Sequence, residues 1–163
     1  MNRKTALVSW VGLGLVVGLI LSIPTATQAA DEKTPPAPKS LYERLGGLPA
    51  ISVVVSDFID ALVPDATLNK NKAIAEARAR VPAPYLKFQV TAMVCQATGG
   101  PCQYPGRNMK DSHAHLHITE AEWDRMAAIF QQILDRYAVP AAEQQELFAI
   151  VGSTKADIVE AKR

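Results

Sequence analysis

The sequence predicts an all-α domain over residues 40–163, and three observations lead to that fold class. The range contains no Asn-Gly or Asp-Gly hairpin signal and no long alternating run, so nothing in it is typical of a strand series. Its apolar residues instead recur at spacings of three and four, which places them on one face of a helix. Proline and glycine stand where such helices would begin and end. We therefore expect roughly five or six helices, the last two of them long.

The first two helices are predicted from a cap, a proline and an apolar stripe. Ser40 is placed to cap a short helix over 41–45, which a pair of glycines stops. Pro49 then falls in the first turn of a second helix, where its missing N–H does no harm. This second helix is expected to end near residue 64. Its stripe consists of Ile51, Val54, Val55, Phe58, Ile59 and Leu62.

The next two segments differ in polarity. Residues 68–82 are polar, alanine-rich and weakly amphipathic, and Pro82 and Pro84 interrupt them. Residues 85–98 are apolar on nearly all sides, which is typical of a helix buried between two layers. Two glycines follow and are expected to end that helix, as glycine commonly does at a helix C-terminus.

Two long helices close the predicted domain. Thr119 and Glu122 have the spacing of a capping box at the start of the first one. Its stripe consists of Trp123, Met126, Ala127, Phe130, Ile133, Leu134 and Tyr137. Val139 and Pro140 end it and begin a single last helix, which is expected to continue past Gly152. The stripe of that last helix consists of Leu147, Ile150, Val151, Thr154, Ile158 and Val159.

Residues 1–29 have the layout of a secretory signal peptide. Arg3 and Lys4 precede an uncharged run over 6–23, and a small-residue cleavage site follows. The run is also about as long as the shortest membrane-spanning helices, so an uncleaved N-terminal anchor is the alternative. Residues 30–39 are charged and proline-rich and are expected to form a linker. Both alternatives predict a periplasmic or secreted bacterial protein, anchored to the inner membrane only if the segment is retained.

The charge balance excludes one class of partner. The whole chain has a formal net charge of +1; without Arg3 and Lys4, 15 basic side chains face 16 acidic ones, a net charge of −1. A chain with this balance lacks the electrostatic footprint of a nucleic-acid-binding protein. No basic helix face indicates contact with lipid, so only the N-terminal segment would touch a membrane.

Cys95 and Cys102 leave two alternatives open. In an oxidising compartment they would pair as a disulfide; otherwise they are two thiols, with Cys95 buried in a helix. The chain has no Cys-x-x-Cys-His motif, so nothing indicates covalent attachment of a haem of the c type.

Residues 106–119 hold every histidine of the chain: His113, His115 and His117. On a strand all three would share one face, whereas on a helix only the first and third would. The stretch is too short to be a useful strand, so a zinc or copper site built on it would have poor geometry. Such a site would also need a nearby carboxylate, Asp111 or Glu120, to complete four-coordination. The alternatives are exposed histidines in a polar connection, or one ligand with two bystanders.

A single ligand would suit a haem iron, which needs one imidazole, an apolar slot and cations near its propionates. On a short helix Met109 and Leu116 would flank His113 on the same face. Arg107 and Lys110 lie within one or two turns and would reach the propionates. The opposite wall would come from Leu86, Val90 and Met93, with Phe58 and Ile59 behind. The spacing permits this arrangement without selecting it over the others.

Four segments in register carry a resemblance to a known family. They are SLYERLGG at 40–47, the phenylalanine of SDFID at Phe58, CQATGGPCQYPGR at 95–107 and MKDSHAHL at 109–116. On these residues the chain resembles the truncated haemoglobins, specifically their first group, from Ser40 to Val159. The resemblance implies a globin-like two-over-two helical sandwich that holds haem b without a covalent bond.

The resemblance also implies which residues form the site. His113 would bind the iron on the proximal side, with Lys110 and Arg107 near the propionates. His115 and His117 would be exposed residues between two helices. The remaining residues expected around the haem are Met109, Leu116, Phe58, Leu86, Gln89 and Val90.

The sequence departs from the family on the distal side, opposite His113. The family usually has a tyrosine after the phenylalanine that matches Phe58, and its hydroxyl hydrogen-bonds dioxygen; here the residue is Ile59. The family's paired phenylalanines are missing too, and a longer segment over 68–84 takes their place. Gln89 is then the main distal donor, either facing the ligand or lying at the haem edge. Because a neutral hydrogen bond contributes about 1 kcal/mol, we expect faster dioxygen release and easier autoxidation than in members with the tyrosine.

The leading hypothesis is a haem protein that reversibly binds a diatomic gas (O2, NO or CO), in oxygen binding or transport or in nitric oxide detoxification. An enzyme is the alternative: a nitric-oxide dioxygenase or a peroxidase-like protein using the same iron. The chain has no flavin or nicotinamide motif, so this enzyme would need an electron-donor protein as partner. A zinc- or copper-binding module without haem is the third alternative.

Overall fold

The computed structural model describes residues 37–160. Within this range the chain forms eight α-helices and one short 3-10 helix, and its one β feature is an isolated bridge between Ile118 and Val159. The predicted all-α class is therefore confirmed. The predicted signal peptide or anchor and most of the linker lie outside the described residues. No helix within 37–160 has the length and apolarity that a membrane span requires.

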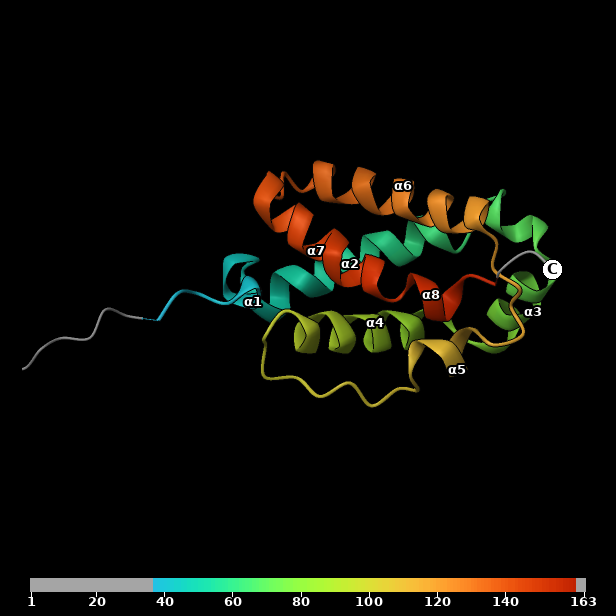
Figure 1. Ribbon diagram of the computed structural model, residues 1–163, viewed down its shortest axis with the longest axis horizontal. Coiled ribbons are helices and arrows are strands. Elements are labelled where there is room, and N and C mark those ends of the chain that lie inside the picture. Colours follow the sequence, from blue (N-terminus) through green and yellow to red (C-terminus); the bar gives the residue numbers. More distant parts are fainter. Residues whose placement is uncertain (1–36, 161–163) are drawn as a thin grey trace, which may run out of the picture. The chain divides into compact units, whose positions relative to one another are not determined.

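The helices follow one another in the order shown in Figure 1. They are α1 (Leu41–Arg44), α2 (Gly47–Leu62), η1 (Leu68–Lys70), α3 (Lys72–Arg80), α4 (Ala83–Ala97), α5 (Met109–His113), α6 (Glu120–Arg136), α7 (Ala141–Ser153) and α8 (Lys155–Ile158). Helix α2 lies between α4 and α6, and α5 packs against α8 (Figure 1). The pairs α2/α4 and α6/α7 form the two layers of the sandwich.

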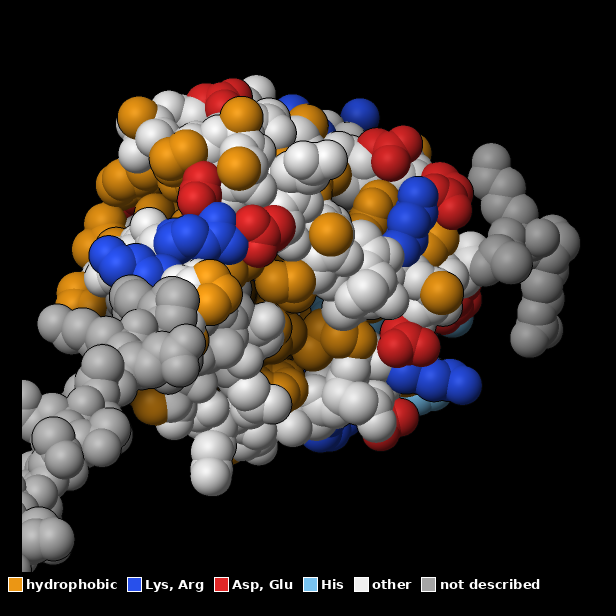
Figure 2. All heavy atoms as spheres, turned by 60° about the vertical axis from the view of Figure 1, so that its left-hand side comes forward, with side chains coloured by type: hydrophobic (Ala, Val, Ile, Leu, Met, Phe, Trp, Pro, Cys, Tyr) orange, Lys and Arg blue, Asp and Glu red, His pale blue; other side chains and the backbone are white. Residues whose placement is uncertain are grey.

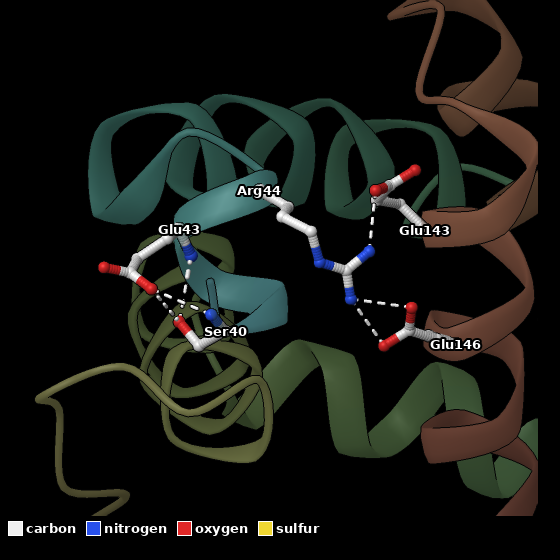
Figure 3. Close-up of polar contacts among 5 residues, drawn as sticks. All are labelled: Ser40, Glu43, Arg44, Glu143 and Glu146. Carbon is white, nitrogen blue, oxygen red and sulfur yellow. Dashed lines mark hydrogen bonds and ion pairs between the residues drawn. The ribbon is translucent and has the colours of Figure 1, made fainter. Parts of the chain in front are cut away.

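Helix α1 is fixed at both ends by polar contacts (Figure 3). The Ser40 side chain accepts a hydrogen bond from the Glu43 N–H, and the Glu43 carboxylate accepts one from the Ser40 N–H at 2.8 Å. This capping box confirms the predicted role of Ser40. At the other end, the Arg44 guanidinium contacts Glu143 and Glu146 of α7, each at 2.6 Å. A four-residue helix therefore joins the N-terminal part of the domain to α7.

The core follows the predicted stripes of α2 and α6. Ile51, Val55 and Ile59 are buried at every fourth residue of α2 and pack against α4. Helix α6 begins with the predicted Thr119 capping box and buries Ile133 and Leu134 completely. Burial of each such side chain contributes about 1.5–3 kcal/mol. The α6 stripe differs from the prediction at its edges, because Ile129 is buried whereas Tyr137 is exposed.

Helix α4 corrects the prediction of a helix buried between layers. One face of α4 packs on α2 through Leu86, Val90 and Val94. The other face stays open, since Tyr85 is 53% and Phe88 is 60% exposed. Within the described part of the chain, α2 is the one helix with which α4 packs extensively. The apolar residues on all sides predicted the helix correctly but not its burial. The sequence does not reveal how many other helices pack against it.

The single last helix predicted over 140–159 is also wrong. Helix α7 ends at Ser153, and the short α8 begins at Lys155. The hydroxyls of Ser153 and Thr154 donate to the carbonyls of Ile150 and Val151, each at 2.7 Å. Such local bonds, together with the poor helix propensity of Gly152, favour an interruption here. The break lets α8 turn toward α5.

Candidate functional site

His113 is the last residue of α5, a five-residue helix that Asn108 caps by accepting from the Asp111 N–H at 2.7 Å. The His113 side chain is half-buried, and its Nδ1 lies 2.9 Å from the Met109 carbonyl oxygen, one turn earlier. A carbonyl oxygen can only accept, so Nδ1 is a proton donor in this contact, and of the two neutral tautomers it selects the one whose Nε2 has a lone pair. A histidine that ligates a metal through Nε2 commonly donates its other ring N–H in this way.

The residues predicted around His113 differ in burial, and the shared helical face expected for Met109 and Leu116 is wrong because α5 ends at His113. Met109 and Leu116 are half-buried, whereas Arg107 and Lys110 are exposed. The Arg107 carbonyl accepts from the hydroxyls of Tyr104 and Ser112, at 2.9 and 3.1 Å. These bonds hold the backbone at the start of α5 and leave two cationic side chains at its solvent edge.

The other two histidines do not join His113. Helix α5 ends at His113, so His113 and His117 do not share a helical face. His115 and His117 are exposed and both have left-handed backbone, with φ of 69° and 52°. Over residues 37–160 no group of three His, Cys, Asp or Glu side chains is placed to hold a metal ion. The structure therefore separates the histidines into one half-buried residue and two surface residues.

Of the residues predicted for the opposite wall, all but Met93 belong to one hydrophobic cluster between α2 and α4. Leu86 and Val90 from α4 pack with Phe58 around the buried α2 residues, among which Ile59 is 2% exposed. Phe58 also contacts Phe130 of α6 edge to face, with ring centroids 5.3 Å apart. Figure 2 shows hydrophobic side chains, in orange, gathered near the centre of one face of the domain. Because Ile59 occupies the position where the family has its tyrosine, this wall carries no hydroxyl there.

Gln89 is the polar residue of the α4 side, and one of its atoms lacks a partner. Its Nε2 donates to the Tyr85 hydroxyl at 2.7 Å, while its Oε1 is buried without a hydrogen bond. No other side-chain nitrogen or oxygen of the described chain is buried in this unpaired state. An unpaired buried acceptor costs about 1–3 kcal/mol. The site therefore combines an apolar wall, a histidine suited to bind a metal and one unpaired polar atom. These features fit a largely apolar metal-containing cofactor that binds a small polar ligand.

The end of α4 is tied to the connection that leads to α5. The structure pairs Cys95 with Cys102 in a disulfide with a Cα–Cα distance of 5.7 Å, which settles the two alternatives left open by the sequence. Cys95 is also completely buried, as the sequence predicted for a cysteine within this helix. The Gly100 N–H donates to the Cys95 carbonyl at 2.8 Å and closes the turn.

Sequence reasoning missed two residues that contact the site. Tyr85 stands four residues before Gln89 on the same helix, and that spacing was visible in the sequence. Asn71 donates from its Nδ2 to the Leu116 carbonyl at 2.8 Å. That bond joins segments 45 residues apart, so no local pattern could have indicated it.

This fold is that of a small globin: a two-layer helical sandwich with a hydrophobic cluster between α2 and α4 and one half-buried histidine at the end of α5. The family model of the bacterial-like globins matches residues 40–160, and the chain belongs to this family. It is 24% identical over 144 residues to the "Group 1 truncated hemoglobin LI410" of Chlamydomonas moewusii, covering 87% of this chain and 81% of that protein. It is 31% identical over 100 residues to the "Group 1 truncated hemoglobin GlbN" of Nostoc commune, covering 61% and 77%.

Solved structures support the same fold. The Fe(III) form of the truncated hemoglobin from Tetrahymena pyriformis superposes with a TM-score of 0.65 at 21% identity, covering 76% of this chain and all of that one. The 2/2 hemoglobin from Synechococcus, in the cyanomet state and with covalently attached heme, superposes with a TM-score of 0.64 at 24% identity, covering 74% and 98%. The predicted resemblance to the group I truncated haemoglobins and the predicted two-over-two fold are confirmed.

Proposed function

We propose that this globin reversibly binds a diatomic gas at the iron of a haem b group held by His113. Membership of the truncated haemoglobins supports haem iron as the cofactor and a diatomic gas as the ligand. The contact of His113 Nδ1 with the Met109 carbonyl carries the residue assignment, because it orients the ring and leaves Nε2 as the nitrogen that would ligate the iron. When bound, the haem iron supplies the coordination position at which a gas binds reversibly.

The remaining residues of the proposed site fall into two groups: apolar side chains that would pack against the haem, and cations that would pair with its propionates. Met109 and Leu116 would contact the haem on the His113 side, and Leu86, Val90 and Phe58 would do so from the α4 and α2 side. The exposed cations of Arg107 and Lys110 would pair with the propionates at the solvent edge. Such exposed pairs contribute little to affinity, so the apolar residues and His113 would provide most of the binding.

Gln89 would supply the hydrogen bond that the missing tyrosine does not. A side-chain amide can turn over about its last bond, and a tyrosine hydroxyl can donate as well as accept. After such a turn the Tyr85 hydroxyl donates to Gln89 Oε1, and Nε2 takes the buried position that Oε1 has in the structure. The buried oxygen is then satisfied, and the freed N–H points to where a polar ligand atom would accept it.

The assignment of His113 is tested by haem content. The protein is purified from a haem-replete host, and its pyridine haemochrome spectrum is compared among His113→Ala, His115→Ala and His117→Ala. We expect a b-type spectrum that is lost in His113→Ala alone, because His115 and His117 are exposed and lie outside α5. Unchanged haem content in His113→Ala would refute the assignment, and a zinc- or copper-loaded protein without haem would favour the metal-binding module.

A role in nitric oxide detoxification is the finer part of this proposal. Turnover would require an electron-donor protein, so nitrate formed from nitric oxide is measured with and without a reductase. Multiple turnovers per iron with the donor would make the protein a nitric-oxide dioxygenase. A single turnover with the donor present would leave it a gas-binding protein.

We also propose that the domain works outside the cytoplasm, in the periplasm or secreted. The Cys95–Cys102 disulfide supports this location, because disulfides persist in oxidising compartments and are rare in the cytosol. Cell fractionation with mass spectrometry of the alkylated protein tests the proposal. Recovery of the domain in the cytoplasm with both thiols alkylated would contradict it.

A further inference from the structure

We propose that Asn71 is a positioning residue for the proximal segment, defined here as residues 113–118. The Asn71 side chain would hold this segment, and with it the His113 imidazole, in the conformation that binds the iron. The inference rests on the proposed function in so far as His113 is the iron ligand. It gives a task to the longer segment between α2 and α4, which the proposed function does not use.

The proximal segment has a backbone that needs support from outside. His115 and His117 are left-handed although neither is glycine, with φ of 69° and 52°. Such residues persist only where surrounding structure holds them. Within residues 115–117 a single backbone N–H has a local partner: that of Leu116 donates to the His113 carbonyl at 3.1 Å. Helix α5, with five residues, is also too short to be stable by itself.

Three contacts from distant parts of the chain supply that support, and one of them joins the exposed His117 Nδ1 to the Glu160 carboxylate at 2.8 Å. On the inner side Asn71 Nδ2 donates to the Leu116 carbonyl at 2.8 Å, between the two left-handed residues. On the outer side the Glu160 N–H donates to the Ile118 carbonyl at 2.9 Å. The Asn71 contact is part-buried, so it is shielded from competition by water, whereas Glu160 is exposed.

The orientation of the Asn71 amide is fixed by its other end. Its Oδ1 accepts from the N–H groups of Ala73 and Ile74, at 3.0 and 3.3 Å, and so caps α3. Ile74 is 8% exposed and anchors that helix in the core. A turn of the amide would lose both cap bonds, so the cap forces Nδ2 toward Leu116. Helix α3 therefore serves as the base from which the proximal segment is held.

The test is Asn71→Asp, which keeps the cap oxygen and replaces the donor by a second carboxylate oxygen facing the Leu116 carbonyl. We expect amide hydrogen exchange at Leu116 to be faster in the full chain, with and without haem. In the haem-loaded protein we expect transfer of haem to excess apomyoglobin to be roughly fivefold faster, the factor one neutral hydrogen bond supplies. The iron–histidine stretching frequency of the ferrous protein should shift or broaden.

Asn69→Asp is the matched control. Asn69 also donates its amide to a backbone carbonyl, that of Val63 at 3.1 Å, but does not bond to the proximal segment. It should keep wild-type exchange at Leu116, the wild-type rate of haem transfer and the wild-type frequency. Asn71→Ser is the second variant if Asn71→Asp fails to fold, because serine caps helices well and is too short to reach Leu116.

Two results would overturn the inference: wild-type exchange at Leu116 together with wild-type haem transfer in both folded Asn71 variants, or equal effects in Asn69→Asp. Failure of the proposed function has a different signature. It appears as haem retained by His113→Ala, whereas the exchange at Leu116 still reports whether Asn71 holds the segment.

Discussion

Gln89 and Tyr85 determine the polarity of the distal side at the scale of single residues. The buried Oε1 of Gln89 has no partner, and the Tyr85 hydroxyl is 2.7 Å from the other end of the same amide. A hydroxyl that can donate or accept stabilises either orientation of the amide. In the proposed site this pair would present an acceptor or a donor to the ligand, whichever the ligand requires. The buried Ile59 side chain offers neither.

This pair yields a prediction for dioxygen release. Gln89→Leu should raise the dioxygen dissociation rate about fivefold, the effect of losing one neutral hydrogen bond. Tyr85→Phe should raise it by a similar factor, because without the hydroxyl Gln89 Oε1 has no donor when Nε2 faces the ligand. Stopped-flow displacement measures both rates. Carbon monoxide dissociation should change less, since that ligand depends less on a donor.

A hydroxyl removed elsewhere provides the control for Tyr85→Phe. Tyr137 donates to Asp57 at 2.7 Å at the far end of α6, so Tyr137→Phe should leave the dioxygen rate unchanged. The interpretation of Gln89 would be wrong if Gln89→Leu and wild type released dioxygen equally slowly.

At the scale of elements, Asp65 joins the end of α2 to η1 and to α6. One of its carboxylate oxygens accepts from the N–H groups of Thr67 and Leu68, at 3.1 and 3.0 Å. The other accepts from the Arg125 guanidinium at 3.0 and 2.8 Å. The Arg125 hydrogen bond, followed by the Leu68 N–H, lowers the pKa of Asp65 below its ordinary value.

The lowered pKa predicts how Asp65 affects stability at acid pH. A carboxyl group with a lower pKa in the folded state stabilises the fold above its unfolded pKa of about 3.9. That contribution disappears as the pH falls through the folded pKa. Asp65→Asn should therefore lower the free energy of unfolding at pH 7 by about 1 kcal/mol, a small value because Arg125 is 39% exposed. In urea titrations the difference from wild type should shrink as the pH falls through the lowered pKa of Asp65; a difference that did not depend on pH would contradict the linkage.

Two glycines predict opposite effects of the same substitution. A Cβ on Gly100 would lie 2.5 Å from a Tyr42 ring carbon and 2.7 Å from the Cys95 carbonyl oxygen, so Gly100→Ala should destabilise the domain by about 1–3 kcal/mol. A Cβ on Gly152, inside α7, would meet nothing within 4 Å. Gly152→Ala should therefore stabilise it by about 0.5–1 kcal/mol through better helix propensity. Thermal unfolding of the two variants measures whether each substitution raises or lowers the stability of the domain. A destabilised Gly152→Ala would show that the break after α7 needs glycine.

At the scale of the whole molecule, local features were predictable and long-range contacts were not. The capping boxes at Ser40 and Thr119 involve residues three apart, so the sequence displays them directly. The apolar stripe of α2 was equally predictable from the sequence, because one face of that helix is buried throughout. Resemblance to the globins added the site residues, which spacing alone left open.

What the sequence could not supply depends on the neighbours of each element. The open face of α4 is a consequence of packing on α2, and the break before α8 is a choice between competing local bonds. The Asn71–Leu116 hydrogen bond joins a segment that the family resemblance left without a role to the one that follows His113. The open face of α4 and the Asn71–Leu116 bond are decided by tertiary contacts, which override local propensity, whereas the break before α8 follows from local bonds.

The disulfide yields the prediction that concerns the whole fold. Cys95 and Cys102 close a loop with a sequence separation of 7, which restricts the unfolded chain and should stabilise the domain by about 2–3 kcal/mol. Cys102→Ser is the suitable variant, because Cys102 is only half-buried whereas Cys95 is fully buried and tolerates no polar replacement. Its melting temperature should fall by roughly 10 °C, and a reductant should lower that of wild type equally while leaving the variant unchanged. If a reductant cleaved the bond, as judged by mass after alkylation, without lowering the melting temperature, the disulfide would not stabilise the fold.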